Sequence, residues 1–335
     1  MDAYLGRAMN KRRKLVIALS AGALTAPFCS FAEQSGKIPH IGYLTFAADI
    51  RQAPAEAFRL GLRELGYVEG RNIIIENRFG KRQEARTAAL AAELVNLKVD
   101  VIIAPDPPAL RAAMNATKTI PIVMRSSTDP VKEGIVASLA RPGGNITGVF
   151  SLYSELNGKR LELLKETVPA ISRVAVFLDP RDREAKFQLG IVQSAARLLS
   201  LIVLPQEVRR PGDFESAFEA AAREHANGLL VLRSPIMVGN AALIANLAAK
   251  AKLPAIYDDV GYSEAGGLMS YGADLPDLYR RLATYVDKIL KGTKPRDLPI
   301  EQPTKLELIV NPNAAKALGI EIPNSILVQA TKVME

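Results

Sequence analysis

The chain has 335 residues, of which 48% are hydrophobic and 23% charged; it contains no tryptophan and carries a formal net charge of +8. This balance is typical of a globular protein and excludes a disordered or fibrous chain. Because a chain of this length exceeds the size at which one hydrophobic core stops growing, we expect two domains.

Residues 1–32 have the pattern of a secretory signal peptide. A basic cluster at 10–14 precedes an apolar run from Leu15 to Phe28, and Ser30 and Ala32 provide the small residues of a cleavage site after Ala32. The apolar run is too short to span a bilayer, so an uncleaved membrane anchor is the weaker alternative. We therefore expect a periplasmic protein that has no stable membrane insertion after cleavage.

Removal of the signal peptide changes two properties of the chain. Residues 1–32 carry five basic side chains and one acidic side chain, so their loss lowers the formal net charge from +8 to +4. This modest excess, with no basic stretch interleaved with aromatics, argues against a nucleic-acid partner. Cys29 leaves with the signal, so no disulfide is expected. The sequence leaves open whether Met1 or Met9 is the start, and whether export is general or twin-arginine.

From residue 38 onward, short apolar runs alternate with longer amphipathic stretches, which predicts βαβ units. The run at 99–104 is continuous enough to be buried on both faces of a parallel sheet. The first half contains predicted strands at 41–46, 72–79, 99–104 and 122–124, and predicted helices at 55–65, 84–97, from 109, and 131–139.

The same alternation starts again after residue 172. It predicts strands at 174–178, 202–204, 228–232 and 255–257, and helices at 183–199, 213–224 and 240–251. Crossings between the halves are expected at 141–148, at 266–272 and near 306–310. The glycine spacing at 141–148 follows a helix and precedes a strand, the reverse of a dinucleotide-binding loop, so we interpret it as a turn.

The predicted fold is α/β, with two Rossmann-like lobes, each a parallel doubly wound sheet, joined by a hinge of three crossovers. The N-terminal lobe is expected to comprise 38–147 plus about 272–304. The C-terminal lobe is expected to comprise 148–271 plus about 305–335.

The residues of common catalytic sites are missing. The two histidines, His40 and His225, lie near no nucleophile signature, and without cysteine they form a poor metal site. No phosphate-binding loop is present. We therefore predict a protein that is not an enzyme and that needs no metal or cofactor.

The loops after the predicted strands are the expected ligand site, because ligands of open α/β sheets bind beyond the carboxyl ends of the strands. Helix N-termini at several of these loops favour an anionic group. For an individual residue such as Asp106, Asp129, Asp179 or Ser234, capping of the following helix is the more economical interpretation. The candidate ligand-binding residues are Thr45, Phe46, Asp106, Pro107, Arg125, Ser126, Asp129, Asp179, Arg181, Ser234, Pro235 and Tyr257.

Five segments carry a family resemblance. They are FRLGLRELGYVEG at 58–70, DPV at 129–131, LARPGGNITG at 139–148, GGLMSYG at 266–272 and EQPTK at 301–305. In this order they resemble the ABC transporter substrate-binding family, whose better-known members bind tryptophan and related aromatic amino acids. The resemblance covers essentially the whole mature chain. It implies a type I periplasmic-binding-protein fold, a small-molecule ligand held between the lobes, and delivery to an ABC permease with its ATPase. It implies no catalytic residues.

One loop departs from the family pattern. The family commonly has a hydroxyl- or glycine-bearing loop after the third strand, whereas this chain has prolines at 105, 107 and 108 and a carboxylate at Asp106. Prolines remove amide donors. We therefore hypothesise a ligand other than a plain aromatic amino acid, with a cationic or hydroxyl group near Asp106 and an acidic group near Arg125, Arg181 or Arg183.

The predicted function is the extracytoplasmic solute-binding component of an ABC importer, acting as a monomer on an amino-acid-like, aromatic or acidic metabolite. The main alternative is a periplasmic sensor that signals to a receptor instead of a permease. A repressor effector domain has the same fold, but the signal peptide and the absence of an N-terminal helix-turn-helix argue against it. An exported enzyme is the remaining alternative. The sequence does not identify the solute.

Overall fold

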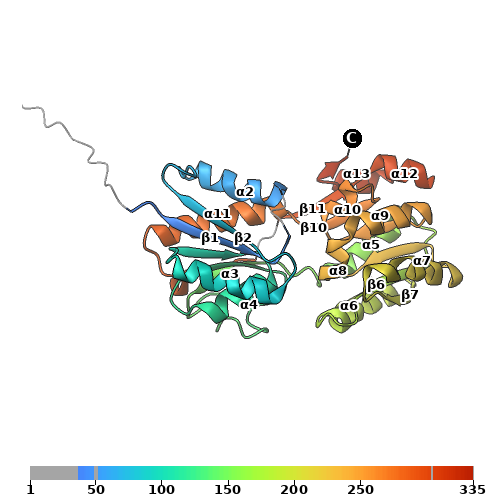
Figure 1. Ribbon diagram of the computed structural model, residues 1–335. Helices are drawn as coiled ribbons and strands as arrows, with labels where there is room; N and C mark the ends of the chain where they lie inside the picture. Colours follow the sequence, from blue (N-terminus) through green and yellow to red (C-terminus); the bar gives the residue numbers. More distant parts are fainter. Residues whose placement is uncertain (1–36, 49–51, 303–304, 335) are drawn as a thin grey trace, which may run out of the picture. The chain divides into compact units, whose positions relative to one another are not determined.

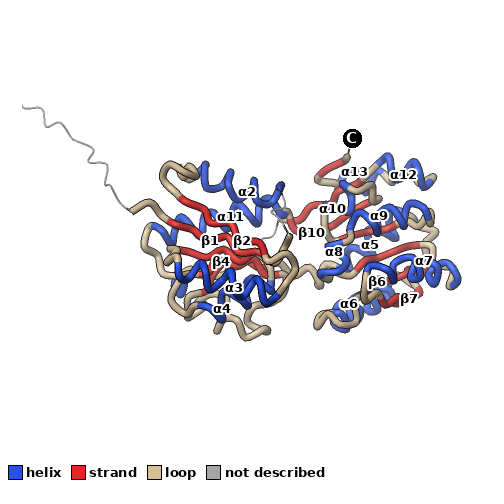
Figure 2. Tube along the Cα trace, in the orientation of Figure 1, coloured by secondary structure: helices blue, strands red, loops and turns tan. Residues whose placement is uncertain are grey.

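The computed structural model describes residues 37–48, 52–302 and 305–334, so the predicted signal peptide lies outside the described residues. The described residues from 38 onward build two sheets with helices on both faces of each (Figures 1 and 2). None of the described helices is long and apolar enough to cross a membrane.

The first lobe is built on a five-stranded sheet in the order β2-β1-β3-β4-β5, and every pair is parallel. Its strands are β1 (His40–Thr45), β2 (Ile74–Phe79), β3 (Val101–Ala104), β4 (Ile122–Ser126) and β5 (Ile146–Phe150). Its helices are α2 (Gln52–Glu64), α3 (Glu84–Asn96), α4 (Pro107–Ala116) and α11 (Leu275–Leu290).

Successive strand residues of this lobe face opposite cores, because side chains alternate along a strand. Ile41 and Val101 pack with α2 and α11 on one face, whereas Leu44 and Ile102 pack with α3 and α4 on the other. Burial on both faces explains why these strands are nearly continuous apolar runs in the sequence.

The second lobe is built on a seven-stranded sheet in the order β12-β11-β10-β9-β8-β6-β7, parallel except between β10 and β11. Its strands are β6 (Arg173–Leu178), β7 (Ile202–Glu207), β8 (Gly228–Val231), β9 (Ala255–Tyr257), β10 (Met269–Ala273), β11 (Leu306–Val310) and β12 (Lys332–Val333). Its helices are α5 (Asn157–Thr167), α6 (Ala185–Leu198), α7 (Phe214–Arg223), α8 (Pro235–Gly239), α9 (Ala241–Lys250), α10 (Val260–Glu264), α12 (Pro312–Leu318) and α13 (Asn324–Gln329). The α/β class with two doubly wound, mainly parallel sheets is confirmed.

The chain passes between the lobes at three places in the described structure. It leaves the first sheet after Phe150 and returns after Ala273, when α11 packs beside α2 in the first lobe. It crosses again between Glu301, which extends the first sheet by a bridge to Val149, and Leu306 in β11. The first crossing follows the expected segment 141–148, the second follows 266–272, and the third precedes Leu306, where the third expected segment begins.

The helix expected at 131–139 is wrong: the chain there forms a series of turns. Gly134 has φ of +67°, outside the right-handed helical region. The amides of Ile135 and Val136 both donate to the Pro130 carbonyl oxygen, so the backbone folds around Pro130 instead of following a helical ladder.

The C-terminal elements of the second lobe were not expected. α12 and α13 follow β11, and α12 begins with Asn311 as a side-chain cap and ends at Gly319 with φ of +70°. Together with the short helices α8 and α10, these elements complete the faces of the second sheet.

Candidate functional site

A cavity of about 850 Å³ is lined by residues from both lobes. On the first lobe it is bounded by the ends of β1, β3 and β4, and on the second by segments that follow β6 and β8. It therefore lies beyond the carboxyl ends of parallel strands, where the topology of open α/β sheets places a ligand.

Eight of the twelve predicted ligand-binding residues line this cavity. They are Thr45, Phe46, Asp106, Pro107, Arg125, Arg181, Ser234 and Pro235. The other four are Ser126, Asp129, Asp179 and Tyr257, and they are not part of its lining.

Asp106 is held by its own chain. One carboxylate oxygen accepts hydrogen bonds from the Thr45 hydroxyl (2.7 Å) and the Phe46 amide (2.9 Å), and the other accepts from the Ala109 amide (2.9 Å). It therefore caps α4, with Pro107 at the first helical position, and fixes the loop after β1. Both carboxylate oxygens thus already accept hydrogen bonds from the chain, and this arrangement does not favour the hypothesis that Asp106 binds a cationic group of the ligand.

The four residues outside the lining have partners of their own. The Ser126 hydroxyl donates to the Thr128 carbonyl oxygen at 2.8 Å, and Asp129 accepts the Val131 amide at 2.8 Å. Asp179 pairs with Arg181, which lowers the pKa of Asp179 although burial opposes this. Tyr257 is wholly buried and its ring stacks on Tyr262 at 4.4 Å.

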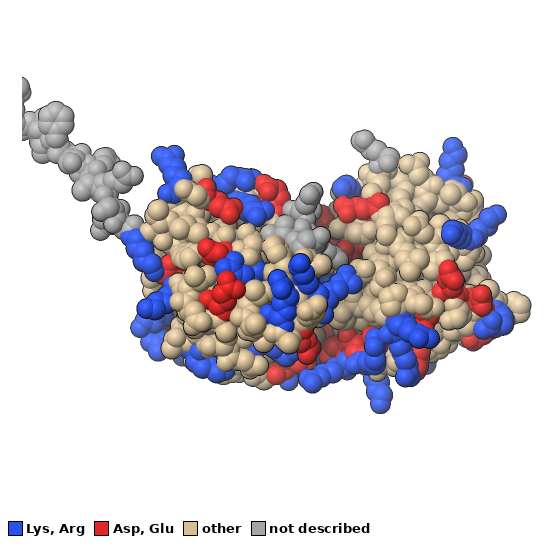
Figure 3. Space-filling view, viewed as in Figure 1, with Lys and Arg blue, Asp and Glu red and all other residues tan. Residues whose placement is uncertain are grey.

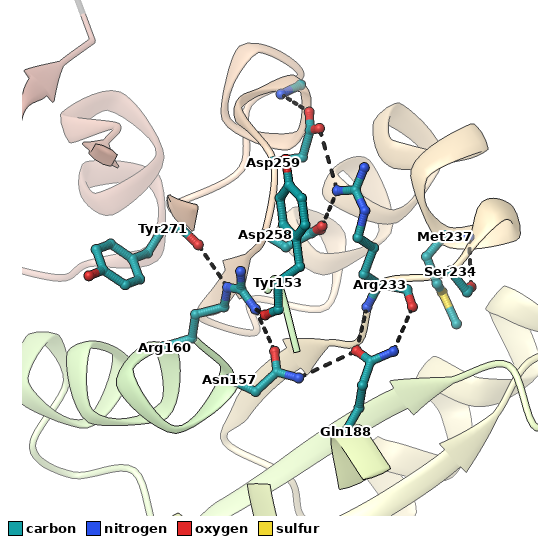
Figure 4. Close-up of polar contacts among 11 residues, drawn as sticks. Tyr153, Asn157, Arg160, Gln188, Arg233, Ser234, Met237, Asp258, Asp259 and Tyr271 are labelled. Carbon is teal, nitrogen blue, oxygen red and sulfur yellow. Dashed lines mark hydrogen bonds and ion pairs between the residues drawn. The ribbon is translucent and has the colours of Figure 1, made fainter. Parts of the chain in front are cut away.

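Arg233 lies on the second lobe's side of the cavity, and Figure 4 shows its guanidinium pointing toward Asp258 and Asp259. Its guanidinium forms a short ion pair with Asp258, lies 3.8 Å from Asp259, and covers the ring of Tyr153 at 4.1 Å. Burial opposes the charge on Arg233, but the fields of Asp258, Tyr153 and Asp259 outweigh it and raise the pKa of the guanidinium. Arg233 is therefore a compensated cation stacked on an aromatic ring.

Backbone hydrogen bonds connect Arg233 to the interior (Figure 4). Gln188 accepts the Arg233 amide and donates to its carbonyl oxygen, and Asn157 donates to Gln188. Asn157 in turn accepts from Arg160 at 2.5 Å. Arg160 also donates to carbonyl oxygens of Tyr153 and Tyr271, so it ties the first crossing segment to β10. Burial lowers the pKa of Arg160 to about 10, so it is still charged at neutral pH.

Arg125 lies on the first lobe's side of the same cavity, near the end of β4, and is 9% exposed. Its Nε donates to the Pro105 carbonyl oxygen at 3.0 Å, and its guanidinium lies 5.9 Å from the Tyr279 ring centroid. Nη1 is buried and has no hydrogen-bond partner among the described residues. Unlike Arg233, it has no carboxylate within ion-pair distance in the described part of the chain.

Sequence reasoning missed several residues of the lining. Tyr43 and Tyr153 are buried, as is Tyr279 on α11, and all three line the cavity. Burial and the neighbouring Tyr279 raise the pKa of Tyr43, so its phenol remains protonated. No pattern in the sequence indicated Tyr279, because α11 returns to the first lobe only after β10. Arg233 and Asp259 stood in loops already singled out, next to the residues that were chosen.

The mouth of the cavity carries charges of both signs. Its exposed lining residues include Arg82, Arg111 and Arg183 together with Glu84. In Figure 3 the basic and acidic side chains are likewise interspersed over the visible surface. The described residues contain no group of three or more histidine, cysteine, aspartate or glutamate side chains arranged to hold a metal ion.

Comparison with known proteins assigns the chain to a family of substrate-binding proteins. Residues 47–334 match the family described as ABC transporter substrate binding protein. A curated relative, the tyrosine-binding protein of Clostridioides difficile (strain R20291), is 29% identical over 266 residues, which cover 79% of this chain and 76% of the relative.

Solved structures agree with the fold. A conserved domain protein from Vibrio cholerae O1 biovar El Tor (strain N16961) is 27% identical with a TM-score of 0.79, over 89% of this chain and 100% of that chain. The ABC domain of a Streptococcus pneumoniae protein in complex with L-Trp also has a TM-score of 0.79 over the same shares, at 24% identity, and supports the fold alone.

Proposed function

Because the chain belongs to the ABC transporter substrate-binding protein family and has the type I periplasmic-binding-protein fold, we propose that it is the extracytoplasmic solute-binding component of an ABC importer. The observation that supports this most directly is the cavity of about 850 Å³ lined by strand ends of both sheets. Its volume lies within the range of small-molecule sites.

The proposed ligand is a small amino-acid-like molecule, or an aromatic or acidic metabolite. Buried tyrosine rings and arginine side chains line the cavity together, which suits a molecule with an apolar ring and a charged end. The curated relative named tyrosine-binding protein supports the same class. Burying about 200 Å² of an aromatic ligand contributes roughly 5 kcal/mol, and charge-assisted hydrogen bonds would bring the total to the roughly 8 kcal/mol of a micromolar complex.

The direct test is calorimetric titration of the mature chain, residues 33–335, with L-tyrosine, L-tryptophan and L-phenylalanine. A dissociation constant at or below about 10 μM for one of them supports the proposal. Absence of heat for these and for a wider set of aromatic and acidic metabolites at millimolar concentration would contradict it.

The importer role needs a cellular test, because a sensor would bind the ligand equally well. Deletion of the gene should abolish uptake of the labelled ligand, and the signal-bearing chain should restore it. If uptake is unchanged while a ligand-dependent response disappears, the protein acts as the sensor considered above. The secreted protein is expected to begin at Glu33, which N-terminal mass spectrometry of the periplasmic fraction checks.

We also propose that the two lobes close on the ligand about the three crossing segments. Two of these segments are anchored in the second lobe by Arg160, through the carbonyl oxygens of Tyr153 and Tyr271. Such anchoring concentrates the backbone change in the few residues beyond the anchor, as in other hinged proteins. A fall in the radius of gyration on ligand addition, measured by small-angle X-ray scattering, supports closure, and an unchanged radius at saturation contradicts it.

A further inference from the structure

The two buried arginines of the cavity are in different electrostatic situations. Arg233 is paired with Asp258 and has Asp259 at 3.8 Å, so its charge is compensated by two carboxylates of the second lobe. Arg125 is the more deeply buried of the two, and its Nη1 has no partner among the described residues. A buried guanidinium that is not paired with a carboxylate is costly, because its charge is removed from water without compensation.

The acid whose field reaches Arg125 is Asp106. Both carboxylate oxygens of Asp106 already accept hydrogen bonds from Thr45, Phe46 and Ala109. The negative charge of Asp106 therefore stabilises the charged form of Arg125 electrostatically, but Asp106 accepts no hydrogen bond from the Arg125 guanidinium.

A second unsatisfied donor lies on the same cavity. The Tyr153 hydroxyl is buried, lines the cavity and has no partner in the described part of the chain. Burial raises the pKa of Tyr153, although Arg233 and Arg125 oppose this, so its phenol keeps its proton and acts as a donor. Two buried donors, one of them cationic, thus line one cavity and have no acceptor among the residues that the structure describes.

We infer that Arg125, assisted by the Tyr153 hydroxyl, binds a carboxylate of the transported ligand, so that the solute is an organic anion or zwitterion and not an amine or a neutral sugar. This inference rests on the proposed solute-binding function and specifies its substrate class. The carboxylate would receive charge-assisted hydrogen bonds from Arg125 Nη1, which are the stronger kind in a site removed from water.

A set of matched probes tests the inference on the wild-type mature chain. L-Tyrosine carries a carboxylate and an ammonium group, 3-(4-hydroxyphenyl)propionate lacks the ammonium, and tyramine lacks the carboxylate. The corresponding indole compounds are L-tryptophan, indole-3-propionate and tryptamine. In each series we expect the amine to bind about 10- to 100-fold more weakly than the tightest acid, the factor given by losing a hydrogen bond to a charged group.

Variants separate the role of Arg125 from that of the other cations. Arg125→Gln should weaken binding of the acid by about 10- to 100-fold and leave tyramine or tryptamine within about twofold. The matched control is Arg223→Gln, because Arg223 is not part of the cavity lining and its side chain is 71% exposed. That control should change no affinity by more than about twofold. Tyr153→Phe should weaken the acid by a few-fold.

Thermal unfolding of the ligand-free variants distinguishes ligand binding from a structural role. Removing an uncompensated buried charge should leave the melting temperature of Arg125→Gln unchanged or raised, whereas loss of a structural residue would lower it. If Arg125→Gln does not fold, the comparison of acids with amines on the wild-type protein decides. Equal binding of acid and amine by the wild type would then overturn the inference.

The outcomes also separate this inference from the function on which it rests. Wild-type protein that binds tyramine or tryptamine as tightly as the acids would contradict the carboxylate site and leave solute binding intact. Wild-type protein that binds none of the six probes, nor other metabolites, would contradict the proposed function itself.

Discussion

Replacement of Asp258 by asparagine should destabilise the protein, because it leaves a buried guanidinium without its main counter-charge. Asp258 is 2% exposed, and the side chain of Arg233 is 16% exposed and covers the Tyr153 ring. Asparagine keeps the shape of the side chain, so the perturbation is mainly electrostatic.

The magnitude follows from the two carboxylates near Arg233. A charge pair at about 4 Å in an effective dielectric of about 20 is worth roughly 4 kcal/mol, and removing one partner of a buried pair typically costs about 3–5 kcal/mol. Asp259, 3.8 Å from the guanidinium, retains part of the compensation. We therefore expect Asp258→Asn to lose about 2–4 kcal/mol of unfolding free energy.

Urea unfolding followed by far-UV circular dichroism measures the loss. The matched control is Glu219→Gln, which removes an acid from an exposed pair with Arg223 (3.9 Å) and should not shift the midpoint measurably. The double variant Asp258→Asn/Arg233→Met should lose less unfolding free energy than Asp258→Asn, because it also removes the guanidinium that Asp258→Asn leaves without its main counter-charge. An Asp258→Asn midpoint equal to that of the wild type would refute the reasoning.

Three further predictions concern other parts of the fold. Tyr67→Phe removes the 3.0 Å hydrogen bond to Asp287 and should cost about 1 kcal/mol in urea, since the phenol is partly exposed. Burial and that bond raise the pKa of Tyr67 to about 12 from 10.0. The contribution of Tyr67 to the unfolding free energy is therefore complete below pH 10 and is lost as the pH rises through 12. A Tyr67→Phe variant whose stability falls at alkaline pH as steeply as that of the wild type would contradict this. Burial raises the pKa of Asp182, so its ionised form disfavours folding. Asp182→Asn should therefore raise the unfolding free energy at pH 7, and this gain should vanish near pH 3, where the carboxyl is protonated. A gain in unfolding free energy that persists at pH 3 would argue against burial of the charge as its cause. Gly148 has φ of +139°, and an added Cβ would lie 2.1 Å from a carbonyl oxygen of β4. Gly148→Ala should therefore lower the unfolding free energy by about 3 kcal/mol or more, or prevent soluble expression. Gly144→Ala is the control and should express normally, because a Cβ there meets nothing within 4 Å.

The sequence by itself determined the fold class, because hydrophobic periodicity is a local property. Strands buried on both faces, such as 101–104, appear as continuous apolar runs, and amphipathic helices appear at their own period. The cap at Asp106 was equally readable, since an aspartate before two prolines is a common start of a helix. The turns at 131–139 were misread, because an apolar pattern does not reveal a left-handed Gly134.

The composition of the site depended on tertiary structure. The topology rule identified the strand-end loops, which explains why Thr45, Arg125 and Ser234 line the cavity. It could not identify Tyr279, which arrives on a helix that follows β10 and packs in the first lobe. Nor could it show that Arg233 has a carboxylate partner while Arg125 has none among the described residues, because pairing depends on which side chains the packed lobes bring together; Arg233 and Asp258 are 25 residues apart and follow different strands. The sequence provides the charges of this site, and only the packed structure determines which of them remain available to a ligand.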